Sequence, residues 1–250
     1  MALNFEDNVP LVVDAQADTA DAKLPEEISA IVPFGRFHYN TLLLCGFGWT
    51  CDNIWMTGLS FQRPQIVEEF GLGNVVSGVI SSMLFAGLLV GAAVWGYLSD
   101  QKGRRFAFTA TLLIASVSAV ITAVMPLWPL IAITLFCVGF GAGGNLPVDG
   151  ALFSEFIPSA RRGFWMVVLA VFWPVGGVIA VGLAWITIPL LPVVYGWRVM
   201  MACMAIIAAT IFVCRRGIPE SARFYAVQGR TEEAVQVIET VCDFIIIASY

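Results

Sequence analysis

Charged residues are scarce in this sequence. Asp, Glu, Lys and Arg make up 12% of its 250 residues and hydrophobic residues make up 59%, whereas a soluble domain carries about 25% charged residues. Thirty uncharged residues precede Asp100, and forty-three follow Arg105. So little charge cannot cover the surface of a water-soluble globule, and uncharged runs of this length are typical of membrane helices. The composition therefore excludes a soluble protein and predicts an all-α membrane protein embedded in a lipid bilayer.

The residues that usually build metal sites and enzyme active sites are also few. The chain has one histidine, His38, and its six cysteines form no C-x-x-C pair. The sequence contains no nucleophile triad and no phosphate-binding glycine loop, and a single histidine removes most metal-enzyme interpretations. We therefore expect no metal, no cofactor, no enzymatic activity and no nucleic-acid partner.

The apolar runs divide into six predicted spans. A membrane helix needs about 20 mainly apolar residues, and "MPLWP" at 125–129 splits the longest run because proline disfavours continuation of a helix. The predicted spans lie at 39–61, within 70–99, on either side of 125–129 within 106–148, within 163–197, and at 197–214. Residues 36–214 thus form a six-helix transmembrane domain, followed by a cytoplasmic amphipathic segment and apolar tail at 215–250.

The first 35 residues concentrate the negative charge. They hold seven acidic side chains and one basic one, Lys23, so this segment carries −6 while the whole chain carries −5. An acidic segment that is poor in aromatic residues has little surface to bury. We expect residues 1–35 to form a disordered cytoplasmic tail.

The basic residues predict the orientation of the spans, because Lys and Arg are retained on the cytoplasmic side. With the amino end inside, only Arg63 and Arg198 fall on the outer side. Ten basic residues then fall on the inner side: Arg36, Lys102, Arg104, Arg105, Arg161, Arg162, Arg215, Arg216, Arg223 and Arg230. This bias predicts that both termini are cytoplasmic.

The densest charged stretch, "GYLSDQKGRR" at 96–105, forms the turn between the second and third predicted spans. A short turn of mixed charge cannot lie in hydrocarbon, so it fixes the position of the hairpin. The pattern Gly96-x-x-x-Asp100-x-x-Gly103-Arg104-Arg105 resembles the loop signature of the major facilitator superfamily. In that family the signature occupies the same place in the chain.

Further elements of the same family follow in the expected order. The segment "SEFIPSARRG" at 154–163 resembles the Glu-x6-Arg-Gly element after helix four of sugar-porter-like members, and "PESAR" at 219–223 resembles the Pro-Glu-Ser-Pro-Arg element after helix six. The segments "GFGAGGNLPVDGALFSEF" at 139–156 and "GWR" at 196–198 resemble the synaptic-vesicle-protein-like branch. The resemblance covers residues 36–238.

This resemblance implies a fold of twelve helices in two halves around a central cavity, each half made of inverted three-helix repeats. The chain matches the amino-terminal half, and we expect it to be truncated. Its missing second half, or a second copy of the chain, would complete the pathway.

The resemblance also implies a cytoplasmic gating network of salt bridges that latches helix ends and breaks when the two halves rock. The alternative is that these charges serve only as topology signals. The residues of this network, with the glycines of the loop signature, are Gly96, Asp100, Gly103, Arg104, Arg105, Glu155, Arg162, Glu220 and Arg223.

Asp52 is the first candidate for transport chemistry, because it lies near the middle of the first predicted span. A carboxylate at mid-membrane costs about 2.5 kcal/mol or more, so it should face a cavity or a partner. One hypothesis is that Asp52 couples transport to a proton or binds the substrate. The other is that it forms a structural hydrogen bond to a neighbouring helix.

Three more residues are candidates for the substrate or proton pathway. Asn145 and Asp149 are spaced i, i+4 and therefore share one helix face. They could form the floor of a polar cavity, or belong to a cytoplasmic helix end joined to Glu155 and Arg162. Trp173 lies next to Pro174, where we expect the fifth span to bend.

Two pairs of glycines predict close helix packing rather than a ligand site. The patterns Gly87-x-x-x-Gly91 and Gly139-x-x-x-Gly143 each place small residues on one helix face, which lets two helices approach closely.

Together these observations predict a secondary active transporter that moves a small organic solute by alternating access. A sugar, a carboxylate or an organic cation would all suit the scaffold, and proton coupling through Asp52 is a hypothesis. The alternative is a non-transporting half-protein that associates with another membrane protein.

The predicted orientation can be tested by labelling single cysteines in intact cells. A cysteine placed beside Arg63 should react with an impermeant maleimide, because Arg63 is assigned to the outer side. A cysteine beside Lys102 should react only after the membrane is permeabilised. The reverse pattern would show that the termini lie outside.

Overall fold

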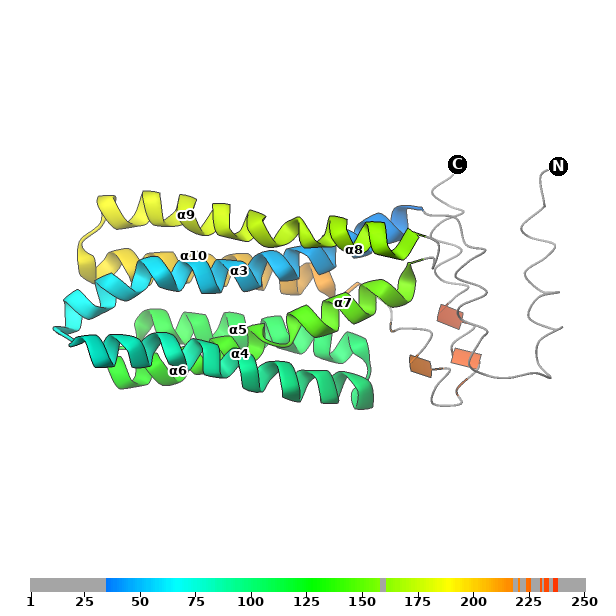
Figure 1. Ribbon diagram of the computed structural model, residues 1–250, viewed down its shortest axis with the longest axis horizontal. Helices are drawn as coiled ribbons and strands as arrows, with labels where there is room; N and C mark the ends of the chain where they lie inside the picture. Colours follow the sequence, from blue (N-terminus) through cyan, green and yellow to red (C-terminus); the bar gives the residue numbers. More distant parts are fainter. Residues whose placement is uncertain are drawn as a thin grey trace.

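The computed structural model describes residues 35–157 and 161–217, with residues 220, 224–225, 230, 232–233 and 236–237 beyond them. Nearly all of the expected acidic tail, and residues 238–250, lie outside the described residues. The described part is all-helical (Figure 1). Its helices are α3 (Arg36–Phe70), α4 (Asn74–Lys102), α5 (Arg104–Val124), α6 (Trp128–Ala142), α7 (Asn145–Phe156), α8 (Arg162–Ala170), α9 (Phe172–Leu190) and α10 (Val193–Arg215).

Two of the predicted spans are interrupted close to a proline. The fourth span consists of α6 and α7, which part at Gly143 and Gly144, and Pro147 cannot donate an amide to the carbonyl of Gly143. The fifth consists of α8 and α9, which part at Val171, and Pro174 leaves the carbonyl of Ala170 without its usual amide. The interruption thus lies three residues before Pro174, and the bend predicted there stays a prediction.

Within the part of the chain that the structure describes, five stretches of helix are long and apolar enough to cross a membrane: Asn74–Lys102, Arg104–Val124, Trp128–Phe156, Arg162–Leu190 and Val193–Arg215. They correspond to the second to sixth predicted spans. The remaining helix, α3, has 35 residues and is long enough at about 1.5 Å per residue. Polar side chains such as Asp52 and Asn53 lower its hydropathy, so its assignment as a sixth span remains a prediction.

The helices pair in a pattern that repeats between the first three spans and the last three. The most extensive contacts join α3 to α9, α4 to α6, and α5 to α10. If the first three spans are exchanged in order for the last three, the contact of α3 with α9 becomes the contact of α6 with α4. The contact of α5 with α10 maps onto itself. This internal symmetry is the arrangement expected of two three-helix repeats.

The glycine pairs lie where α4 and α6 touch, which confirms their predicted packing role. A Cβ atom on Gly87 would lie 2.1 Å from the carbonyl oxygen of Phe136, and one on Gly139 would lie 2.1 Å from that of Leu84. Gly91 and Gly143 show the same close approach to the opposite backbone. Each helix thus presents its glycines to the other, and only hydrogen fits at these positions.

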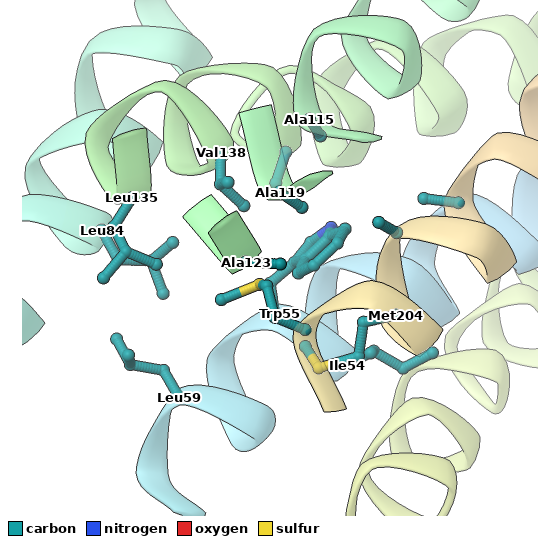
Figure 2. Packing of buried hydrophobic residues seen from close by; sticks show 14 of the residues in the cluster. Ile54, Trp55, Leu59, Leu84, Ala115, Ala119, Ala123, Leu135, Val138 and Met204 are labelled. Atoms are coloured by element: carbon teal, nitrogen blue, oxygen red, sulfur yellow. The ribbon is translucent and has the colours of Figure 1, made fainter. Parts of the chain in front are cut away.

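The apolar core forms two clusters along the bundle. One surrounds Trp55, which packs with the small residues Ala115, Ala119 and Ala123 of α5 (Figure 2). The other includes residues closer to the end of the bundle that carries the 96–105 turn, which we call the loop end. Along α5, Thr111 separates Phe108 of the second cluster from residue 112 of the first. The space between the clusters is polar.

Candidate functional site

A buried hydrogen-bond chain crosses the bundle between the two apolar clusters. Asn145, the first residue of α7, donates its amide Nδ2 to Oδ1 of Asp52 on α3 at 2.8 Å. Its Oδ1 accepts a hydrogen bond from the hydroxyl of Thr111 on α5 at 2.7 Å. All three side chains are 1% exposed or less. The chain therefore ties α3, α5 and α7 together through a single asparagine.

Arg215 supplies the only cation of this buried region among the described residues. It is the last residue of α10, yet its side chain is fully buried. Its guanidinium forms an ion pair with Asp149 and donates from Nη1 to the carbonyl of Phe108 at 2.8 Å. It also donates to the carbonyl of Leu44 at 3.3 Å and stacks over the Phe108 ring, 3.8 Å from its centroid.

Arg215 and the asparagine chain are joined into one unit, which we call the charge cluster: Asp52, Thr111, Asn145, Asp149 and Arg215. The link is a contact of 3.5 Å between Nη1 of Arg215 and Oδ1 of Asn145. Two carboxyl groups and one guanidinium therefore share a region that neither water nor lipid reaches.

Gly48 on α3 makes room for the ion pair. A Cβ atom at this position would lie 1.7 Å from Nη2 of Arg215 and 1.9 Å from Oδ2 of Asp149. Any other residue would displace one of the two partners, because neither can withdraw to solvent. The small residue on α3 is thus a condition for the ion pair between α7 and α10.

One oxygen of each carboxyl group in the charge cluster has no hydrogen-bond partner among the described residues. These are Oδ2 of Asp52 and Oδ1 of Asp149. With both carboxyl groups ionised, the three charged groups sum to −1. An uncompensated charge is costly in a buried site, so the cluster favours one further positive charge, such as a proton.

The sequence correctly placed Asn145 and Asp149 on one helix face, and both point into the bundle. They contact Asp52 and Arg215 rather than the Glu155 end of α7. The structure also gives Asp52 the hydrogen bond to a neighbouring helix that was one of its two predicted roles. Trp173 lies apart from the cluster, and its carbonyl accepts a hydrogen bond from Asn53 Nδ2 at 2.7 Å.

Arg215 was missed as a site residue, because the sequence places it just past the sixth predicted span, where a basic residue is expected to be a topology signal. The structure instead continues α10 through Arg215 and turns its side chain inward. Of the two adjacent arginines at this helix end, Arg216 is the exposed one. The only sequence feature that could have indicated a buried arginine here is the presence of two adjacent arginines at the end of a span.

At the loop end, a glutamate from beyond α10 caps the start of α5. Glu220 Oε1 accepts hydrogen bonds from the backbone amides of Arg104 at 2.7 Å and Arg105 at 3.0 Å. A carboxylate is favourable here because it satisfies free amides and complements the helix dipole. Gly103 before them has φ +100°, and a Cβ there would lie 2.4 Å from Glu220 Oε2.

The side chain of Arg104 gathers the other charges of the loop end. It pairs with Asp100 at 2.7 Å and with Glu155 at the end of α7 at 3.4 Å. It also donates to the hydroxyl of Ser99 at 2.7 Å. The α4–α5 turn, α7 and the segment after α10 are therefore linked through Arg104 and two glutamates, Glu155 and Glu220.

The other predicted network residues contribute less to these contacts. Arg105 donates to the carbonyl of Arg216 at 3.3 Å. Arg162 forms no ion pair with any described residue, and Glu155 pairs with Arg104 instead. A Cβ atom added to Gly96 would meet no described atom within 4 Å. Arg223 lies outside the described residues.

Another ion pair, which was not predicted, lies at the opposite end of the bundle. Glu69 at the end of α3 pairs with Arg198 of α10 at 2.6 Å and accepts a hydrogen bond from Trp197 Nε1, also at 2.6 Å. Arg198 additionally donates to the carbonyl of Met125 just after α5 at 3.3 Å. This contact joins the ends of α3, α5 and α10.

Comparison with known proteins defines the class of this bundle. Residues 30–243 match the family described as "Sugar (and other) transporter". Because the match covers most of the chain, the protein belongs to this family of major facilitator superfamily transporters, which are not enzymes.

Particular relatives include the organic cation/carnitine transporter 7 of Arabidopsis thaliana, 35% identical over 86% of this chain and 42% of that protein. The niacin transporter NiaP of Acinetobacter baylyi is 33% identical over 84% of this chain and 47% of its own length. The synaptic vesicle 2-related protein of Bos taurus is 28% identical over 96% and 43%. The chain thus spans somewhat less than half the length of these relatives.

Solved structures show the same fold at low sequence identity. The proton:xylose symporter XylE bound to 6-bromo-6-deoxy-D-glucose superposes with a TM-score of 0.76 at 18% identity, over 83% of this chain and 51% of that one. The partially occluded inward-open form of XylE from E. coli gives 0.76 at 19% identity, over 82% and 55%. The described bundle therefore has the architecture of half of a major facilitator.

The two glycines of the 96–105 turn should respond differently to alanine. Gly103→Ala should destabilise the fold by about 1–3 kcal/mol, because φ +100° is strained for any other residue, and its Cβ would displace Glu220. Gly96→Ala is the matched control and should be neutral or slightly stabilising, since it lies in open space within α4. Thermal unfolding of the purified variants measures both; equal losses would contradict the capping role of Glu220.

Proposed function

We propose that this chain forms the amino-terminal half of a secondary active transporter that moves a small organic solute by alternating access, with a proton carried on Asp52. A second six-helix half, or a second copy of the chain, would supply the other wall of the pathway. The family membership supports transport as the activity. The observation that carries the proton assignment is the charge cluster, where two buried carboxyl groups face one guanidinium.

Asp52 is the better proton carrier of the two aspartates. Asp149 is held by a direct ion pair with Arg215 and therefore has its counter-charge in place. Asp52 receives only a neutral amide hydrogen bond on Oδ1, and its Oδ2 has no described partner. A proton on Oδ2 would neutralise the cluster without breaking any contact in it. Its release to one side and recapture from the other would couple charge movement to the rocking of the two halves.

The contacts at the loop end support a role as a latch. Arg104 and Glu220 join the α4–α5 turn to α7 and to the segment after α10. With the orientation predicted from the basic residues, these contacts lie on the cytoplasmic side. We infer that they hold the inner helix ends together in one state of the cycle and separate in the other.

The solute is proposed only as a class. Relatives are named for carnitine and organic cations and for niacin, and a protein of the same fold is named for xylose. These molecules share a small size and several polar groups. Radiolabelled carnitine, niacin and xylose are therefore suitable probes for a first transport assay.

The coupling role can be tested with Asp52→Asn in proteoliposomes that contain the complete transporter, assembled from this chain and the half that completes it. If Asp52 carries the coupling proton, uphill uptake driven by a proton gradient should be abolished. Solute exchange at equal concentrations should survive, because exchange needs the conformational change but no net proton flow.

The same two measurements separate the alternatives. Loss of exchange together with uptake would indicate that Asp52 binds the solute directly. Full gradient-driven uptake by the Asn variant would remove Asp52 from the mechanism. Asn53→Ala is a suitable control, since Asn53 is the polar neighbour of Asp52 but bonds to the Trp173 carbonyl outside the charge cluster.

A further inference from the structure

The geometry of the charge cluster assigns a task to Arg215 and Asp149 as well as to Asp52. Arg215 is the only buried cation described near two carboxyl groups, and it pairs directly with one of them. Arg215 also contacts Asn145, whose amide is bonded to the other carboxyl group. A single guanidinium therefore stands between two acids, with Asn145 placed between it and Asp52.

We propose that Arg215 and Asp149 are positioning residues that set how tightly Asp52 holds its proton. This inference rests on the proposed function only in taking Asp52 as a proton site. As long as Asp149 holds the guanidinium, Asp52 has no positive partner and keeps a proton. When the Asp149–Arg215 contact loosens, the guanidinium becomes available to Asp52, and the proton is released.

Asn145 transmits this effect because both ends of its side-chain amide are occupied. Its oxygen accepts from Thr111 and lies 3.5 Å from Arg215, which leaves its nitrogen to donate to Asp52. This orientation directs the hydrogen bond to Oδ1 and leaves Oδ2 as the oxygen that bears the proton. Asn145 thus connects the arginine to the acid without being charged itself.

No other charged group described near Asp52 could take this role. On α3 itself the nearest titratable neighbour is the Cys51 thiol, and α7 and α10 contribute Asp149 and Arg215. Helix α9, which packs along α3, carries no ionisable side chain. Those of α4 and α5 lie toward the loop end, and they are Tyr97, Asp100, Lys102, Arg104 and Arg105. In α6 and α8 the titratable groups are Cys137 and Arg162, and neither contacts the cluster.

The test measures the proton on Asp52 directly, without a solute. The full chain is reconstituted in lipid nanodiscs, and the infrared carbonyl band of a protonated carboxyl group is followed through a pH titration. The wild-type chain should show a band that is missing in Asp52→Asn. Potassium is the only added cation in the first series, and sodium replaces it in the second.

Substitutions in the pair should move the titration in opposite directions. In Asp149→Asn the guanidinium is released to Asp52, so the midpoint should fall by about one to three pH units, the usual effect of a nearby opposite charge. Adding Arg215→Gln to Asp149→Asn removes that cation, and the midpoint should rise again by a similar amount. Arg215→Lys keeps the positive charge and should stay closer to wild type than Arg215→Gln.

Arg216→Gln is the matched control, because Arg216 neighbours Arg215 in sequence but its side chain stacks on Phe212 outside the cluster. Its midpoint should equal that of wild type. The double variant, Asp149→Asn with Arg215→Gln, leaves no buried guanidinium without a partner. It should therefore fold even if one of the single variants does not.

Two results would overturn the inference. One is a band that titrates at the same pH in Asp149→Asn, in the double variant and in wild type, which would leave the pair a purely structural role. The other is a band that disappears in sodium, which would make the neutralising ligand a metal cation. A band that responds as expected while Asp52→Asn still supports gradient-driven uptake would keep this inference and reject only the coupling role of Asp52.

Discussion

The buried ion pair between Arg215 and Asp149 is the constraint on which the centre of the structure depends. Once both charges are removed from water, each must stay within reach of the other, since an unpaired charge in such a site is very costly. The pair fixes the end of α10 against α7 and requires Gly48 on α3. It also leaves the orientation of Asn145, and hence the environment of Asp52, with little freedom.

Around this centre the bundle alternates between apolar and polar layers along its length. The charge cluster lies between two hydrophobic clusters, and each end of the bundle carries its own ion pairs, Glu69 with Arg198 at one end and Arg104 with its acids at the other. The glycine contact between α4 and α6 adds close packing without polar groups. The bundle is thus held together at three levels along its length.

Much of the fold could be predicted from the sequence, because long apolar runs, the proline at 174 and the glycine pairs each have a local physical meaning. The site was predicted in part: Asp52, Asn145 and Asp149 are conspicuous as polar residues in apolar surroundings. Arg215 was not, because a basic residue at a span end fits a topology signal equally well. Contacts such as that of Glu69 with Arg198, 129 residues apart, depend on tertiary structure and leave no local pattern.

A double-mutant cycle on the Arg215–Asp149 pair tests this account most directly, by the free energy of unfolding of the chain in lipid. Arg215→Gln should cost about 3–5 kcal/mol, because it leaves two buried carboxyl groups without a cation. Asp149→Asn should cost less, since Asp52 can then accept the guanidinium, and the double variant should be more stable than Arg215→Gln alone. Strictly additive losses would contradict the claim that this pair organises the centre of the bundle.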